Sequence, residues 1–225
     1  LVLGGNFEID NAKNLIEKYF GGIQKSDFIP QVVAPTQTLT ENKKIIHKDN
    51  IQLPRIYLAW HSDKAFDKHD AALDILADIL TGTKNSRLQK NLLFDNQIAQ
   101  DVSSFQYSAR LAGSFIIIAT AKPGIELENL KSEIFGEIFN LINNGLTEEE
   151  LIRSKNSIKS SYIYSLQKLD SIVDHLNHYN FFLNEPDSFL FDINRYEKVT
   201  ANDVISAAKM FLSKPYVELN IIPKS

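Results

Sequence analysis

The feature that most constrains the fold is that strand-like runs occur in pairs, with helical segments between the pairs. The first pair is Lys43–Lys48 and Arg55–His61, and the second is Ala99–Ser108 and Gly113–Ala121, joined by a short turn. Strands that lie this close together in sequence favour antiparallel pairing over the crossover connections of a parallel sheet. The pattern predicts an α+β fold, a two-layer sandwich in which helices cover one face of a mainly antiparallel sheet of about five or six strands.

Apolar residues at helical spacing predict the helices, and capping residues mark where some of them begin. The predicted helices cover about 71–81, 86–94, 127–144, 147–164, a continuation with interruptions to about 182, and a last helix from 200. Thr147 with Glu150, and Thr200 with Asp203, have the spacing of N-terminal caps. A closing strand is predicted at Tyr216–Ile222.

The first 22 residues form a unit of their own in the sequence pattern. Leu1–Gly4 has the pattern of a strand, and Asp10 is a plausible N-cap for a helix that ends at Gly21 and Gly22. Residues 23–40 contain two prolines and no apolar period, so we expect a linker and a domain boundary there. Because the chain opens with Leu inside an apolar run, we expect it to be a piece of a longer protein.

Composition excludes several classes of function. The 225 residues carry a net charge of −4, which offers no basic surface for a nucleic acid. There is no cysteine, which excludes thiol catalysis and sites that depend on cysteine ligands. No apolar run reaches the length of about 18 residues that a membrane span needs. We therefore expect a soluble globular protein without a membrane segment, in a compartment that the sequence leaves open.

No catalytic or metal-binding motif is present. None of the five histidines fits His-x-x-Glu-His or its inverse, and no Gly-x-Ser-x-Gly or P-loop occurs. His175 and His178 lie one helical turn apart beside Asp174, a spacing open to a surface zinc site or to ordinary exposed helix residues, of which we favour the second. The sequence therefore predicts no catalytic residue and no metal ligand.

Arg87 is unusual because the helix dipole disfavours a cation in the first turn of a helix. It comes after the polar loop that begins at Gly82, and it opens the predicted helix at 86–94. A specific contact is therefore expected to hold it. Two interpretations stay open: an ion pair that joins two helices, which we favour, or a functional contact.

Several segments, in this order and spacing, carry a resemblance to a known family. They are Leu1–Gly21, Leu53–Trp60, His69–Ala77, Asn85–Leu88 and Gly145–Leu151. Together they resemble the second, non-catalytic module of the pitrilysin/insulinase family of zinc peptidases, which is related to mitochondrial processing peptidase. The resemblance implies that residues 1–22 are the tail end of a preceding homologous module, and that 41–225 form the second, inactive peptidase-like module.

The resemblance also implies partners and a metal outside this chain. Catalytic modules of the family hold zinc with His-x-x-Glu-His and a distant Glu, so zinc is expected in a companion catalytic module and no cofactor in this chain. That companion lies in the same chain or in a partner subunit, and the two modules enclose a peptide substrate. In active relatives an Arg and a Tyr seven residues later polarise the peptide; Leu93 and Gln100 stand at these positions here, and both depart from the pattern.

The sequence thus yields one preferred function and two alternatives. The preferred function is the substrate-enclosing, non-catalytic half of a zinc metalloendopeptidase acting on short or unfolded peptides, inactive by itself. The alternatives are a scaffold or assembly subunit without proteolytic role, and a solitary binding module that shares only the fold. The candidate substrate- or interface-facing residues are Asn85, Ser86, Arg87 and Gln100.

Overall fold

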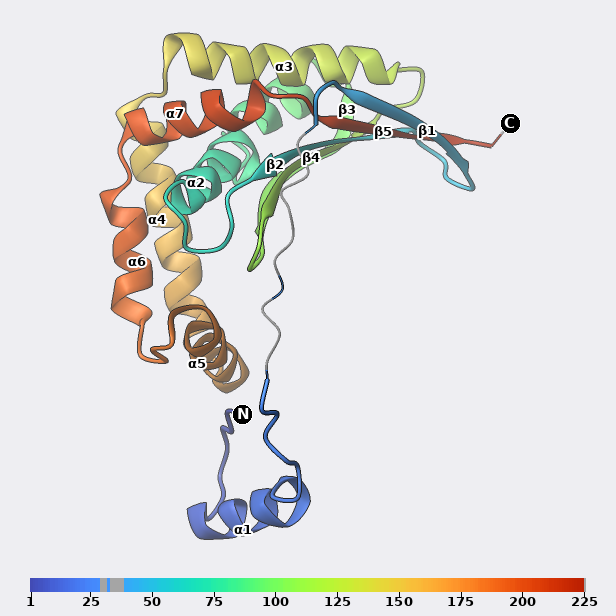
Figure 1. Ribbon diagram of the computed structural model, residues 1–225. Helices are drawn as coiled ribbons and strands as arrows, with labels where there is room; N and C mark the ends of the chain where they lie inside the picture. The colour runs from blue at the N-terminus through green and yellow to red at the C-terminus, as the bar shows by residue number, and fades with distance from the viewer. Residues whose placement is uncertain (29–31, 33–38, 225) are drawn as a thin grey trace.

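The computed structural model describes residues 1–28, 32 and 39–224, and its strands form one five-stranded sheet with helices over one face (Figure 1). The strands are β1 (Lys43–Asp49), β2 (Arg55–Ser62), β3 (Ala99–Ser108), β4 (Gly113–Ala121) and β5 (Val217–Pro223). Their order is β1-β5-β2-β4-β3, and the β1–β5 pair is parallel while the other pairs are antiparallel. The predicted α+β fold with a mainly antiparallel sheet is confirmed. β3 and β4 form the expected hairpin, whereas β5 separates β1 from β2.

Eight helices are described, and those that contact the sheet pack on one of its faces. The eight are α1 (Ile9–Phe20), α2 (Asp70–Thr81), the π-helix η1 (Gln89–Asp95), α3 (Leu127–Asn144), α4 (Glu148–Ser165), α5 (Leu169–Leu183), α6 (Phe189–Lys198) and α7 (Ala201–Leu212). Contacts with the strands come chiefly from α2, α3, α7 and η1, while α4 and α6 pack on α2. The sequence analysis did not predict α6. Its N-cap, Ser188, makes no side-chain capping bond, so the local signal that marked α4 and α7 is missing there.

Both predicted capping boxes are present. The Thr147 hydroxyl accepts a hydrogen bond from the Glu150 backbone N–H at 3.2 Å, and the Glu150 carboxylate accepts one from the Thr147 N–H at 2.8 Å. Thr200 and Asp203 make the same reciprocal pair at the start of α7. These bonds satisfy backbone donors that the first turn of a helix leaves unpaired.

The core lies between the sheet and the helices and follows the two-residue period of the strands. In β2, the side chains of Ile56, Leu58 and Trp60 face the helices and are at most 1% exposed. Arg55 and Tyr57 alternate with them and face the opposite side. Each aliphatic side chain buried in this way contributes roughly 1.5–3 kcal/mol to folding. The alternation therefore assigns one face of the sheet to the core and leaves the other available.

The N-terminal region differs from the sequence-based expectation in two ways. Leu1–Gly4 is not a strand, since no described strand lies beside it to supply hydrogen bonds. The first helix begins at Ile9 with Glu8 as its N-cap, so Asp10 lies within the first turn. α1 contributes no buried residue and lies apart from the sheet (Figure 1). Of the predicted linker, residues 29–31 and 33–38 lie outside the described residues.

Candidate functional site

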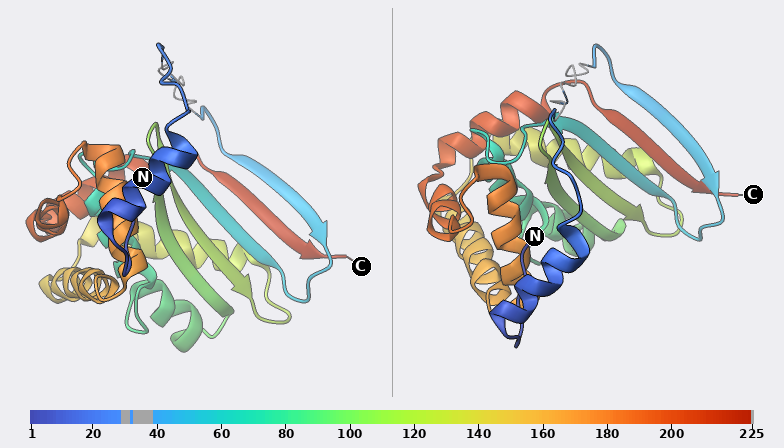
Figure 2. Two further views of the ribbon diagram at one scale, coloured as in Figure 1. Left: turned by 90° about the horizontal axis from the view of Figure 1, so that it is seen from below. Right: turned by 60° about the horizontal axis from the view of Figure 1, so that its bottom comes forward.

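One face of the sheet carries none of the helices that form the core, as Figure 2 shows, where α3 lies behind the strands. Side chains from neighbouring strands form a continuous apolar surface on this open face. At its centre Tyr57 of β2 is paired with Ile118 of β4 and with Leu219 of β5. These three side chains are half-buried because they cover one another without a layer above them. Toward the two edges exposure rises, to 41% for Phe105 of β3 and 51% for Ile45 of β1.

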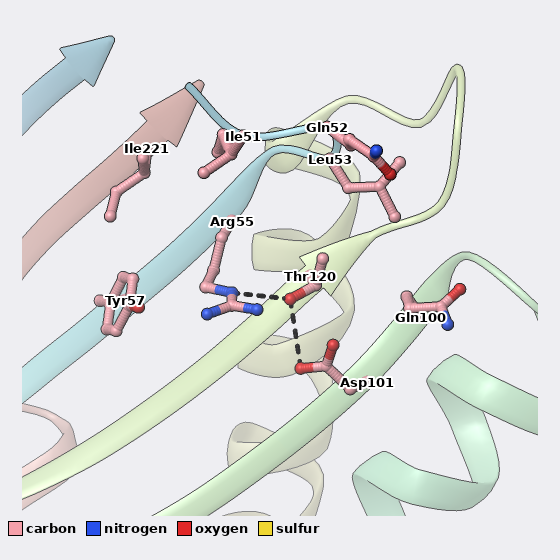
Figure 3. A pocket seen from close by; sticks show the side chains of 9 residues that line it. All are labelled: Ile51, Gln52, Leu53, Arg55, Tyr57, Gln100, Asp101, Thr120 and Ile221. Atoms are coloured by element: carbon pink, nitrogen blue, oxygen red, sulfur yellow. Dashed lines mark hydrogen bonds between the residues drawn. The ribbon is translucent and has the colours of Figure 1, made fainter. Parts of the chain in front are cut away.

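A hollow of about 380 Å³ lies at the end of this face where β2 begins and β4 ends (Figure 3). It is lined by Ile51, Gln52, Leu53, Arg55, Tyr57, Gln100, Asp101, Thr120 and Ile221. Apolar side chains and polar groups thus share the lining. Such a mixture is typical of sites that hold a ligand by burial and orient it by a few hydrogen bonds.

Three polar residues on neighbouring strands form a hydrogen-bonded chain across the floor of the hollow. Arg55 Nε donates to Thr120 Oγ1 at 2.8 Å, and Thr120 Oγ1 donates to Asp101 Oδ1 at 3.2 Å. Strand register produces the alignment, because Thr120 is paired with Arg55 on one side and with Asp101 on the other. Figure 3 shows the three side chains pointing toward one another.

A β-bulge in β3 determines where Gln100 points. Ala99 is paired with Ala121 and Asp101 with Thr120, so Gln100 is an extra residue without a partner on β4. A bulge bends the strand and changes the direction of a side chain. Gln100 is exposed and lines the hollow, with an amide able to donate and to accept hydrogen bonds.

Arg55 is the cation of the hollow, and its environment favours the charged form. The neighbouring Tyr57 hydroxyl raises the pKa of Arg55, partial burial opposes this, and the negative charge of Asp101 raises the pKa further. Within the described part of the chain no carboxylate lies within 4.0 Å of the guanidinium; Nε donates to the Thr120 hydroxyl, and the Tyr57 hydroxyl is a further polar neighbour. The terminal nitrogens, Nη1 and Nη2, therefore have no carboxylate partner among the described residues.

Arg87 is held by the ion pair that the sequence analysis favoured. Its Nε donates to Glu150 Oε1 at 2.7 Å, and its Nη2 donates to Glu150 Oε2 and to the Gly145 carbonyl, both at 2.9 Å. Both ionic side chains are only 14% exposed. Although burial opposes ionisation, the bonds from Arg87 and Thr147 lower the pKa of Glu150 to about 2. The pair joins the start of α4 to the segment that precedes η1.

The other sequence-predicted site residues lie in different surroundings. Ser86 is 1% exposed; its hydroxyl donates to the Asp78 carbonyl at 2.8 Å and accepts from the Thr83 N–H at 2.9 Å. Asn85 is exposed in the loop after α2. Of the four predicted residues, only Gln100 belongs to the lining of the hollow.

The sequence analysis did not single out Arg55, Asp101 or Thr120. Arg55 does have a local signal, since it occupies an outward position of a strand whose alternate residues are buried. Thr120 and Asp101 have none, because 19 residues separate them in sequence and only the β3–β4 register brings them together. Leu93, aligned with the family's Arg, is partly buried against the core.

The described residues do not fit a zinc site. No group of three or more His, Cys, Asp or Glu side chains is placed to hold a metal ion in the described ranges. His175 Nε2 lies 3.1 Å from the Ser165 hydroxyl, and His178 packs against Phe66 and Phe182, so both histidines belong to an aromatic cluster. Among the described helices, none has the length and apolarity to cross a membrane.

Comparison with known sequences identifies relatives among zinc proteases. Residues 1–158 match the family described as the peptidase M16 inactive domain. A zinc protease of Helicobacter pylori, PqqE, is 25% identical over 174 residues, which are 75% of this chain and 38% of that protein. The matched stretch thus covers well under half of the length of this relative.

Comparison with solved structures extends the likeness to nearly the whole chain. A crystal structure of a protease from Helicobacter pylori has a TM-score of 0.85 at 21% identity, over 97% of this chain and 53% of that chain. A chain of complex III2 from Candida albicans has a TM-score of 0.78 at 15% identity, over 96% of this chain and 53% of that chain. At these identities the likeness establishes the fold.

Proposed function

Because this chain belongs to the family of M16 peptidase inactive domains, we propose that it is the non-catalytic half of a zinc metalloendopeptidase and encloses the peptide substrate. The substrates we propose are short or unfolded peptides. The observation that carries this proposal is the open face of the sheet, which presents apolar side chains and the polar hollow of Arg55 on a surface that no described helix covers. An extended peptide suits such a surface, because apolar contacts hold it without demanding one sequence.

The proposal assigns zinc and catalysis to a companion module in the same protein or in a partner subunit. The described residues hold no group fitted to zinc, whereas the relative PqqE is a zinc protease of more than twice the matched length. The N-terminal segment supports a companion in the same chain. α1 buries no residue here, and its apolar Leu15, Tyr19 and Phe20 are 45%, 67% and 56% exposed. We infer that residues 1–22 pack on a preceding module.

Within the proposed chamber, different roles suit the predicted site residues. Gln100 faces the substrate, since it is exposed beside the hollow, and its amide replaces part of what a Tyr offers a peptide carbonyl. Asn85, exposed after α2, suits an interface with the companion. Ser86 and Arg87 have a structural role, since their hydrogen bonds to Asp78 and Glu150 hold the segment between α2 and η1 in place.

The first experiment measures hydrolysis of an unfolded peptide by the complete parent protein, with and without a zinc chelator. We expect cleavage that the chelator abolishes, and no cleavage by residues 1–225 alone. Ile118→Lys places a charge at the centre of the open face and is expected to raise KM about tenfold, because a charge there disfavours apolar contact. Activity of the isolated chain, or an unchanged KM, would contradict the proposal.

A matched control is available on α6, which packs on α2 and α4 and not on the sheet. Leu190 on α6 is 77% exposed, so Leu190→Lys changes an apolar residue to the same cation away from the sheet. We expect this variant to retain the KM of the parent. Circular dichroism of both variants establishes that each keeps its fold.

A second candidate function is a scaffold or assembly subunit without proteolytic role. The observation that favours this second candidate is the likeness of fold to a chain of complex III2. The experiment described above tests both candidates. A parent that shows no chelator-sensitive cleavage, alone or with its partner subunits, would support the scaffold over the peptidase.

A further inference from the structure

The arginines of this chain use their guanidinium groups in different ways. Arg195 directs all three nitrogens to carboxylates, Nη1 to Asp70 and both Nε and Nη2 to Asp192. Arg87 holds the Glu150 carboxylate with two nitrogens. Arg55 instead bonds the neutral Thr120 hydroxyl through Nε alone. Of these three arginines, Arg55 is the one that presents an unpaired cation to an open hollow.

The bonds around Arg55 fix the orientation of the guanidinium and leave it available. Thr120 donates its proton to Asp101, so a lone pair of its oxygen faces Arg55 Nε. With Nε held, the guanidinium plane is set, and the two terminal nitrogens form a fork that matches the two oxygens of a carboxylate. Orientation before binding lowers the entropy cost of capturing a ligand.

The charge of the hollow selects the kind of anion. Asp101 lies near Arg55 without pairing with it directly, so the two charges together are balanced. A phosphate, with up to two negative charges, meets the repulsion of Asp101. A single carboxylate satisfies Arg55, and an adjacent N–H donor is favoured by the Asp101 oxygens.

The walls of the hollow supply the rest of the recognition. Ile51, Leu53 and Ile221 form an apolar side next to Arg55, and about 380 Å³ is enough for one large apolar side chain with its backbone. Gln100 on β3 lines the hollow on the side away from Arg55, and its amide points away from the Arg55 guanidinium (Figure 3).

We propose that the hollow binds a peptide carboxylate through Arg55, and that its preferred ligand is the free C-terminus of a peptide ending in an apolar residue. This inference rests on the proposed function, since it places the end of an enclosed peptide on the open face. An Asp or Glu side chain offers the same carboxylate chemistry, and the experiment separates the two sources. The open face by itself selects only for extended, unfolded peptides. The proposed site adds a preference for a peptide whose C-terminus is free.

The experiment measures binding of fluorescent peptides to residues 1–225 by anisotropy at low salt. One acetylated, uncharged peptide ending in Leu is used as the free acid and as the C-terminal amide, and a third peptide is the amide with one internal Glu. We expect the free acid to bind about tenfold more tightly than the amide, as a charge-assisted bidentate contact predicts. Arg55→Gln is expected to abolish this difference, and Arg55→Lys to retain part of it.

The matched control is Arg110→Gln, which removes a cation that lies over Phe181, outside the hollow. It is expected to leave the preference for the acid intact. Tight binding of the internal-Glu amide, lost in Arg55→Gln, would support the carboxylate site and assign its ligand to an acidic side chain. Equal binding of acid and amide, or a preference that survives Arg55→Gln, would overturn this inference alone. Failure to bind any of the three peptides would contradict the enclosing function and this inference together.

Discussion

Two regions of the molecule each place an arginine near an aspartate and a tyrosine, but the two arginines are bonded in opposite ways. Arg195 on α6 is 15% exposed, pairs with Asp70 at 2.9 Å and with Asp192 at 2.7 Å, and lies 4.5 Å from the centre of the Phe66 ring. Arg55 on the open face is exposed and bonds a hydroxyl. Residue type therefore does not separate a structural cation from a binding cation. What separates them is how many donors the protein itself satisfies.

The Arg195 region also couples several helices. The Asp192 carboxylate accepts from Tyr179 Oη at 2.8 Å, and Tyr196 Oη donates to Asp74 of α2 at 2.8 Å. These bonds join α2, α5 and α6 through groups that are largely out of water. A network of this kind specifies one arrangement of the helices and is costly to break.

The largest predicted effect comes from Arg195→Met. Removing the guanidinium leaves Asp70 and Asp192 buried without a cation, so we expect the free energy of unfolding to fall by about 3–5 kcal/mol. Urea denaturation at neutral pH measures it. Arg195→Lys keeps the charge and is expected to lose less. A loss below about 1 kcal/mol for Arg195→Met would show that this arginine resembles Arg55 in its contribution.

The next effect is expected for Arg87→Met. The native pKa of Glu150, about 2, lies below its ordinary value of 4.5, so the stability it contributes is present above pH 4.5 and is lost as the pH falls toward 2. We expect the free energy of unfolding to fall by about 1–2 kcal/mol at pH 7, after allowing for solvent screening. We also expect the stability of the variant to depend less on pH as the pH falls from 4.5 toward 2.

The control for Arg87→Met is Arg153→Met. Arg153 lies on α4, where its Nη1 is 4.0 Å from the carboxylate of Glu149, which is 89% exposed. Such a pair contributes little, so stability is expected to change by less than about 0.5 kcal/mol. Unfolding curves from pH 2 to 7 for both variants test whether the Arg87–Glu150 pair stabilises the protein more than the Arg153–Glu149 pair. Equal losses of stability in the two variants would contradict this prediction.

Asp74→Asn is expected to stabilise the protein. Burial and the negative charge of Asp70 raise the pKa of Asp74 to about 7, against the hydrogen bond from Tyr196. With the native pKa above the ordinary value of 3.8, its contribution is fully present below pH 3.8 and is lost as the pH rises through 7. Asn is neutral throughout and still accepts the bond, so we expect a gain on the order of 1 kcal/mol at pH 8.

The pH dependence separates this effect from a general change in surface charge. The difference between Asp74→Asn and the parent is expected to shrink as the pH falls from 8 to 4. Asp187→Asn, at an exposed carboxylate, serves as the control and is expected to show no such change. A gain that is the same at pH 4 and pH 8 would refute the role given to Asp74.

The smallest effect on stability is expected for Arg55→Gln. The side chain is exposed and its one hydrogen bond is with a hydroxyl, so the free energy of unfolding is expected to change by less than about 0.5 kcal/mol. Loss of the preference for a free C-terminus without loss of stability would complete the contrast with Arg195. A destabilisation above about 1 kcal/mol would instead make Arg55 a structural residue.

Local patterns predicted much of the fold. The positions of β1 to β5 were predicted from strand-like runs, and the starts of α4 and α7 from Thr147 and Thr200. These signals act over two to four residues and are therefore visible in the sequence. The predicted strand at Leu1–Gly4 failed because a strand also needs a neighbour.

The candidate site was less accessible to prediction than the fold. Gln100 came from the family resemblance, whereas the bulge that leaves it without a partner on β4 is a property of the β3–β4 register. Arg87 was expected to have a specific contact, and its partner, Glu150, lies 63 residues further along the chain. The sequence therefore indicated that some contact was needed without indicating with which group.

Local sequence patterns were enough to establish the class of fold, the starts of two helices and the lack of a zinc-peptidase motif, because alternation, capping and motifs each occupy a short stretch of chain. The packing of distant elements was needed to place β5 between β1 and β2, and to give Arg55 and Arg195 opposite surroundings. The bonds of Arg55 to Thr120 and of Arg195 to Asp70 join residues 65 and 125 positions apart. Such pairs depend on strand register and on how helices pack, and no short stretch of sequence contains that information.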